Sequence, residues 1–217
     1  MKLGLICALL LGATPALAGR QSFPPRDEAL RDPSLVAFRD AMRAAVARRD
    51  TEALTAAACP DLMLSDDGIG GPEELRQFLT SEQGEPAADV EARWQALART
   101  LAAPGYFDDD GEFWMPFHWR IHLPARIEPA WSYFTNGENV NLRAAPNREA
   151  PVVTRVSFEV VLAAEPTSEN DYRAVILTDG TQGYLHRDYL VQMSGYRAAF
   201  AVSPDGTWQL CSFTSGR

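Results

Sequence analysis

The stretch from Asn139 to Gln192 constrains the fold most strongly, because short apolar runs alternate there with turn residues. Valine, isoleucine, leucine and tyrosine dominate the runs, which occupy residues 152–156, 160–162, 172–177 and 183–186. Proline, asparagine, serine and an Asp-Gly pair separate them. Several short strands with turns between them predict a small β-barrel that is closed or nearly closed.

Two motifs frame this stretch. The opening motif is Val140-Asn141-Leu142-Arg143-Ala144-Ala145-Pro146, and the closing motif is Gly183-Tyr184-Leu185, followed by His186-Arg187-Asp188-Tyr189-Leu190. Together they resemble the bacterial Src-homology-3 domain family. The resemblance implies a barrel over residues 135–192 that recognises a peptide or a cell-wall component. Tyr172 stands where many members of that family have a tryptophan, a difference that would reshape a binding groove.

Three signature residues of the motifs have structural explanations. The planar donors of Arg143 suit it to lie across the barrel mouth and satisfy loop carbonyls. Pro146 fixes the backbone entering the first loop. Gly183 permits close approach of neighbouring strands. We therefore assign these residues to the barrel itself.

The candidate ligand contacts lie at the end of the closing motif. Tyr184, His186, Asp188 and Tyr189 combine aromatic and polar groups, as grooves that bind peptides do. The alternative is that Tyr189 and Leu190 plug the end of the barrel. We expect no metal and no cofactor at this site.

The preceding half is expected to be helical. Residues 19–31 are polar and contain Pro24-Pro25, which predicts an extended, mobile leader. Capping residues and apolar spacing predict helices at 33–48 and 51–58, the latter ended by Pro60, and at 72–80 and about 90–101. A short strand is expected at 62–64.

A β-hairpin is predicted at the end of the chain, with strands on either side of Pro204-Asp205-Gly206. The fold class is therefore α+β: an N-terminal helical half, a small β-barrel and a C-terminal β-hairpin. The first half weakly resembles the nuclear-transport-factor-2-like fold. That resemblance implies an α+β domain over residues 19–134, completed by the hairpin at 194–214, with the barrel inserted between them.

The first 18 residues have the features of a cleaved secretory signal peptide. Lys2 precedes an apolar run at 3–11, and Ala16-Leu17-Ala18 is a small-residue cleavage site. We therefore expect a periplasmic or secreted protein without a transmembrane span. In an oxidising compartment Cys59 and Cys211 are candidates for a disulfide, which would fit the inserted arrangement; two buried thiols are the alternative.

Residues 106–134 are unusually rich in aromatic side chains, which favours packing at a junction between two domains. His118 and His122 lie near the acidic run Asp108–Asp110 and Glu112, so a zinc site or a cell-envelope hydrolase site within residues 33–134 is the enzymatic alternative. No nucleophile elbow or HExxH motif is present.

The preferred prediction is an exported, non-enzymatic binding or scaffold protein of the cell envelope. Its expected partner is a peptide, a protein or a peptidoglycan fragment. The net charge of −9 argues against nucleic acid, because an acidic chain repels phosphate backbones.

Overall fold

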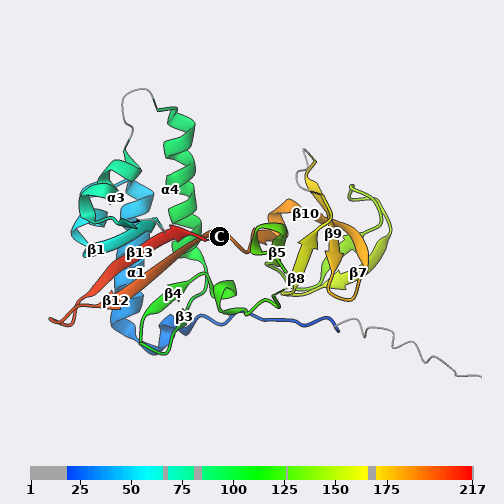
Figure 1. Ribbon diagram of the computed structural model, residues 1–217, viewed down its shortest axis with the longest axis horizontal. Coiled ribbons are helices and arrows are strands. Elements are labelled where there is room, and N and C mark those ends of the chain that lie inside the picture. Colours follow the sequence, from blue (N-terminus) through cyan, green and yellow to red (C-terminus); the bar gives the residue numbers. More distant parts are fainter. Residues whose placement is uncertain (1–18, 66–67, 81–84, 126, 166–169, 217) are drawn as a thin grey trace, which may run out of the picture.

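The computed structural model describes residues 19–65, 68–80, 85–125, 127–165 and 170–216. The predicted signal peptide therefore lies outside the described residues. Figure 1 shows two lobes side by side. The helical lobe comprises residues 27–120 and 196–216, and the sheet lobe comprises residues 132–192. The chain is a mixed α+β protein whose C-terminal half is mostly strand.

The α-helices of the described residues all precede Ala103. They are α1 (Pro33–Arg48), α2 (Thr51–Ala56), α3 (Pro72–Leu79) and α4 (Ala87–Ala102). The Asp32 carboxylate accepts hydrogen bonds from the first free amides of α1, and proline occupies the first helical position. Asp50 caps α2 in the same way. Local capping chemistry therefore accounts for the starts of α1 and α2, and all the expected helices are present near their predicted bounds.

The hairpin at the end of the chain completes the sheet of the helical lobe. Its strands are β12 (Tyr196–Val202) and β13 (Trp208–Ser215), and the turn holds Gly206 at φ 85°. The strand order is β2-β1-β13-β12-β4-β3. The other strands are β1 (Ala58–Ser65), β2 (Gly68–Ile69), β3 (Tyr106–Phe107) and β4 (Phe113–Met115). β13 runs parallel to β1, so strands more than 140 residues apart in the sequence lie side by side in one sheet.

Strand β1 is longer than predicted and includes Pro60, which was expected to end a helix. Helix α2 already stops at Ala56. The register of β1 with β13 shifts between Ala58 and Met63, and β2 pairs only with Met63 and Ser65. Pro60 thus lies at an irregular part of the strand, where a missing backbone N–H is tolerated.

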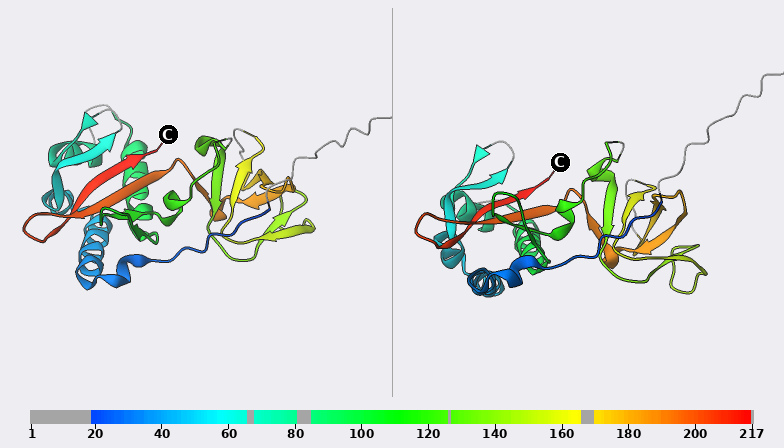
Figure 2. Two further views of the ribbon diagram at one scale, coloured as in Figure 1. Left: turned by 60° about the horizontal axis from the view of Figure 1, so that its bottom comes forward. Right: turned by 90° about the horizontal axis from the view of Figure 1, so that it is seen from below.

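The core of the helical lobe lies between its helices and one face of this sheet (Figure 2). Phe38 of α1 meets Phe200 of β12 edge to face, with ring centroids 5.0 Å apart. Buried side chains come from every part of the lobe, including Leu35, Met42, Leu75, Leu97, Leu101, Phe113, Phe200, Leu210 and Phe213. The hairpin is therefore part of this core.

The sheet lobe contains seven antiparallel strands in the order β11-β5-β8-β9-β10-β6-β7. They are β5 (Ser132–Thr135), β6 (Val140–Arg143), β7 (Val152–Val156), β8 (Val160–Ala163), β9 (Tyr172–Leu177), β10 (Gln182–His186) and β11 (Leu190–Gln192). Its core is largely aliphatic: Val140, Leu142, Val156, Val161, Val175, Leu177 and Leu185. Within the described ladder β11 and β7 are the two edges, so a closed barrel is not established.

Two signature residues of the sheet lobe have the surroundings expected of them. Nη1 of Arg143 donates to the carbonyl of Ala150 at 2.8 Å, which ties down the loop after β6. A Cβ on Gly183 would lie 2.7 Å from Cγ of Leu142. Only glycine lets β10 approach β6 this closely.

A line of stacked rings joins the two lobes. Trp119 and His118 belong to the 3₁₀-helix η2 (Phe117–Arg120), and His118 stacks on Phe134 of β5 at 5.7 Å. Phe134 stacks in turn on Phe158. Beyond Trp119, the guanidinium of Arg197 in β12 lies 4.5 Å from the indole ring. Side chains from the aromatic-rich residues 106–134 therefore contact both sheets.

A disulfide joins Cys59 of β1 to Cys211 of β13, with Cα atoms 4.8 Å apart. This confirms the predicted pair. It links strands that are neighbours in the sheet although 152 residues separate them in sequence. Within the described residues, no helix combines the length and the apolar character that crossing a membrane requires.

The segment before α1 differs from its prediction. It is extended, as expected, but its residues bond to both lobes instead of forming a mobile leader. Arg20 pairs with Glu159 at 2.7 Å, and Asp27 pairs with Arg39 at 2.5 Å. The 3₁₀-helix η1 (Glu28–Arg31) then leads into α1.

Candidate functional site

The aromatic cluster of the sheet lobe lies on the outer side of β9 and β10. Leu185 is fully buried, so the neighbouring side chains Tyr184 and His186 point to the opposite, outer side of the strand. His186 pairs directly with Tyr172 of β9, and their rings meet edge to face at 5.0 Å. The His186 ring also meets that of Tyr189, in η4 (Arg187–Tyr189), with ring centroids 6.5 Å apart.

The structure brings together three of the four predicted contact residues. Nδ1 of His186 accepts a hydrogen bond from the backbone amide of Asp188 at 3.3 Å, and Oδ2 of Asp188 lies at the same distance from Nδ1. His186 also contacts Tyr189. Tyr184, the fourth, shares the outer side of β10 but lies opposite Arg143 of β6. It extends the surface along the strand.

The cluster is accessible and has a mixed chemical character. The Tyr189 side chain is 44% exposed, and Asp188 carries an exposed carboxylate beside it. The inner edge of the Tyr189 ring abuts Gly137, where a Cβ would lie 3.2 Å from Cδ1. One edge of the Tyr189 ring thus packs on the backbone at Gly137, while the rest of the side chain is open to solvent. Exposed ring faces beside a carboxylate suit the side chains and amide groups of an extended peptide.

Tyr172 belongs to this cluster, but the sequence pattern did not place it there. It lies 14 residues before His186 and was noted only as a departure from the family pattern. The antiparallel register of β9 and β10 makes the two residues direct neighbours. The available signal was the Asp179-Gly180 turn, which sets this register.

The alternative site around His118 and His122 is not assembled. His118 is buried in the ring stack, whereas His122 is exposed. Asp108 accepts hydrogen bonds from the amide of Glu112 and from Nε1 of Trp114, so it organises a turn. Among the described residues, no three histidine, cysteine or acidic side chains lie close enough to hold a metal ion. Cys59 and Cys211 form a disulfide, so neither offers a thiolate nucleophile.

The burial of His118 at the joint between the lobes keeps its ring neutral down to low pH. Desolvation lowers its pKa from 6.5 to about 4, although a hydrogen bond with the Gln192 backbone opposes the change. Its Nε2 has no hydrogen-bond partner among the described residues. A proton on this ring would thus place a charge between aromatic faces.

We expect acid to destabilise the fold through His118. Between pH 6.5 and 4 the unfolded chain binds this proton and the folded chain does not. The free energy of unfolding should fall by about 2 kcal/mol between pH 7 and pH 5 because of this group, and its contribution should level off below pH 4. Urea titrations at each pH would measure it.

Carboxylates also make the free energy of unfolding depend on pH. The difference between the pH profiles of wild type and His118→Phe isolates the contribution of His118. The phenylalanine variant should lose the extra acid sensitivity, whereas the exposed control His122→Gln should keep it. Parallel pH profiles for wild type and His118→Phe would contradict the assignment.

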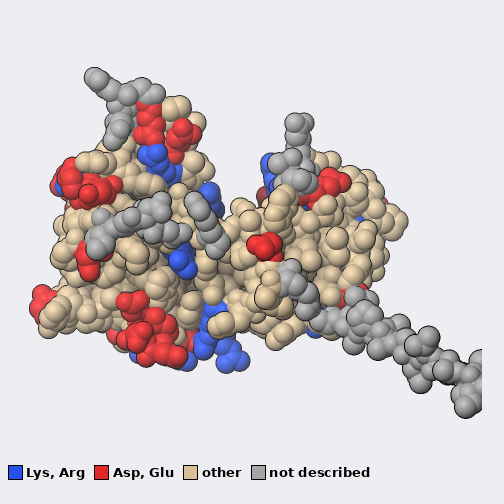
Figure 3. Space-filling view, in the orientation of Figure 1, with Lys and Arg blue, Asp and Glu red and all other residues tan. Residues whose placement is uncertain are grey.

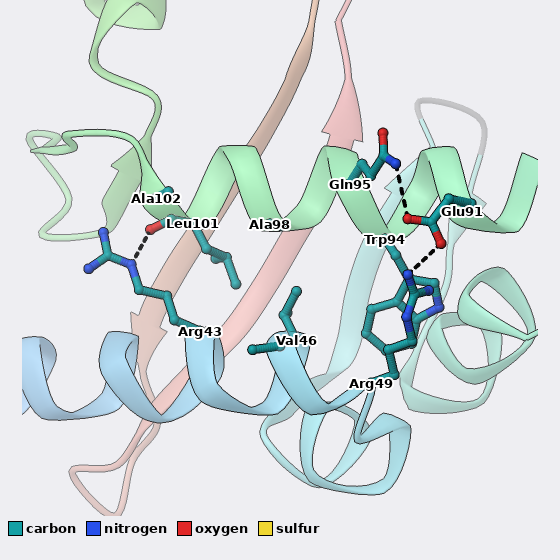
Figure 4. A pocket seen from close by; sticks show the side chains of 10 residues that line it. Arg43, Val46, Arg49, Glu91, Trp94, Gln95, Ala98, Leu101 and Ala102 are labelled. Atoms are coloured by element: carbon teal, nitrogen blue, oxygen red, sulfur yellow. Dashed lines mark hydrogen bonds and ion pairs between the residues drawn. The ribbon is translucent and has the colours of Figure 1, made fainter.

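The helical lobe has a groove of about 420 Å³ between α1 and α4 (Figure 4). Val46, Trp94 and Leu101 contribute buried apolar surface. Arg49 pairs with Glu91 across one end and covers the Trp94 ring at 5.4 Å, while Nε of Arg43 donates to the carbonyl of Leu101 at the other. Its charged groups are thus engaged with the protein itself.

A second hollow, of about 330 Å³, surrounds the disulfide. It is lined by Cys59 and Cys211, by Glu112 and by the tip of the terminal hairpin. Burial and the nearby charge of Asp108 raise the pKa of the Glu112 carboxyl. The lining also includes the carboxyl of Asp61, but it contains no histidine, and its cysteines are joined in the disulfide.

Comparisons with protein-family models, with curated proteins and with solved structures found no match to this chain. The function is therefore argued from the residues and their geometry.

Proposed function

We propose that this protein is an exported, non-enzymatic binding protein whose sheet lobe is a bacterial Src-homology-3-type barrel that recognises an extended peptide. The peptide belongs either to a protein or to peptidoglycan in the cell envelope. The observation that carries the proposal is the cluster in which the His186 ring, on the outer side of β10, contacts both Tyr172 and Tyr189. Asp188 and Tyr184 complete this surface.

Two further features support the proposal. The ring faces lie on strands and a short helix anchored to a packed core, which keeps the surface ordered before a ligand arrives. Acidic side chains occur over both lobes on the face shown in Figure 3, most densely on the helical lobe. Together with the net charge of −9, they favour a neutral or basic ligand over a polyanion.

Binding to soluble muropeptides and to a library of extended peptides tests the site. Tyr189→Ala should weaken the binding of any captured ligand at least tenfold, because a tyrosine hot spot in such a surface contributes about 2 kcal/mol or more and tenfold corresponds to about 1.4 kcal/mol. Titration calorimetry with wild type and variant would measure the difference.

Trp131→Ala is the matched control. Trp131 is similarly exposed, at 47%, but precedes β5 and has no ring contact with the cluster. It should bind like the wild type. Equal affinities for wild type and a folded Tyr189→Ala variant would show that the ligand binds elsewhere.

A further inference from the structure

Residues 20–28 form a segment, here called the strap, that runs along both lobes; it is extended up to Glu28, where η1 begins. Figure 1 shows it in blue, passing from the sheet lobe to the start of α1, and both views of Figure 2 show the same path. Pro24 and Pro25 occupy its middle. Because proline restricts the backbone, this middle part is a stiff spacer between two sets of contacts.

The first set of contacts binds the strap to the sheet lobe. Nε and Nη2 of Arg20 donate to the two carboxylate oxygens of Glu159 at 2.8 and 2.7 Å. Ser22 forms a β-bridge with Glu159, and the amide of Phe23 donates to the carbonyl of Phe158 at 2.7 Å. The Phe23 ring packs on the small core around Phe134, at the ring stack.

The burial of Glu159 explains why this end of the strap requires an arginine at position 20. Its side chain is only 9% exposed, and besides Arg20 the amide of Ser157 donates to it. Without Arg20 a nearly buried carboxylate would lose its countercharge, which is strongly unfavourable. Because the arginine donates two hydrogen bonds to the carboxylate, the pair fixes the orientation of the two groups as well as their distance.

The second set of contacts binds the strap to the helical lobe. Asp27 accepts two hydrogen bonds from the buried Arg39 of α1 and one from the amide of Gly105. Glu28 accepts from Nη1 of Arg120 at 3.0 Å, and its own amide donates to the carbonyl of Gly105. The strap is therefore fixed by charge pairs at both of its ends.

Among the described residues, the lobes are also linked by the segments 121–125 and 127–131, the short connection 193–195 and the ring stack. The ring stack carries apolar contacts and one hydrogen bond but no ion pair in the described residues. From these contacts we infer that the strap is the clamp that holds the two lobes in one orientation, and that releasing its Arg20 end lets the sheet lobe move relative to the helical lobe.

Charge reversal with rescue tests this inference in the full-length chain. Arg20→Glu should release the strap, and Arg20→Glu combined with Glu159→Arg should restore it. The distance between spin labels at the exposed positions Ala44 and Glu149, each changed to cysteine, should have a distribution at least twofold broader in the single variant. In the double variant it should return to the wild-type width.

Hydrogen exchange at the Phe23 amide reports the strap itself, and we expect at least tenfold faster exchange in Arg20→Glu. Arg187→Glu, which breaks an exposed pair with Asp171 on the sheet lobe, should change neither readout. Since Glu159 is buried, Arg20→Ala is the second variant in case the double variant misfolds; it should broaden the distribution as Arg20→Glu does. Fast Phe23 exchange with an unchanged distance distribution would overturn the inference, as would a strap that stays protected in both single variants.

Discussion

Reduction of the Cys59–Cys211 disulfide is expected to lower the free energy of unfolding by about 5 kcal/mol. The bond closes a loop with a sequence separation of 152 residues, and its main effect is to restrict the unfolded chain. In the folded state the two residues lie on neighbouring strands of the helical lobe, so they stay close without the bond. Guanidinium titrations with and without a thiol reductant would measure the loss.

The double variant Cys59→Ser and Cys211→Ser provides the control. It should match the reduced wild type within about 1 kcal/mol, and adding reductant should not change it further. Equal denaturation midpoints for oxidised and reduced wild type would contradict a stabilising role for this bond.

Replacing Asp27 by alanine is expected to cost about 3–5 kcal/mol, because it leaves the guanidinium of Arg39 buried without a countercharge. The Arg39 side chain is 6% exposed, lies over the ring of Phe113 at 5.8 Å and donates two hydrogen bonds to Asp27. Burial by itself would raise the pKa of the Asp27 carboxyl, but Arg39 outweighs it and holds the pKa below the ordinary value. The stabilisation should therefore be present at neutral pH and lost as the pH falls through this lowered pKa.

Asp40→Ala is the matched control on the same helix. Asp40 is 64% exposed and lies 3.5 Å from Arg43, so its loss should cost less than about 1 kcal/mol. Adding Arg39→Met to Asp27→Ala should recover much of the stability, since an apolar side chain at position 39 needs no countercharge. A loss below 1 kcal/mol for Asp27→Ala would show that Arg39 is compensated in another way.

Local chemistry made the helices predictable. Asp32 followed by Pro33 marks the start of α1, and apolar residues at helical spacing mark its buried side; the structure has the same bounds. The terminal hairpin was equally predictable, because Pro204-Asp205-Gly206 separates two runs of β-forming residues. The same local reasoning failed at Pro60, since a register irregularity between two distant strands accommodates it.

The candidate site was predictable only in part. Three of its residues lie close together in the closing motif, so sequence proximity was enough to find His186, Asp188 and Tyr189. Tyr172 joins them through strand register, which acts across a turn. For the alternative site, closeness in sequence was misleading. His118 and His122 are four residues apart, yet His118 is buried among rings and His122 is exposed, so they do not form one site.

The sequence by itself determined the local elements, the α+β class and the two cysteines available for pairing, because capping, turn chemistry and apolar spacing act over a few residues. The tertiary structure decided which distant segments meet. It placed the terminal hairpin beside β1, Cys211 beside Cys59, and the strap along both lobes. These choices depend on burying shared apolar surface and on neutralising buried charges such as Glu159 and Arg39, and both are properties of neighbours in space.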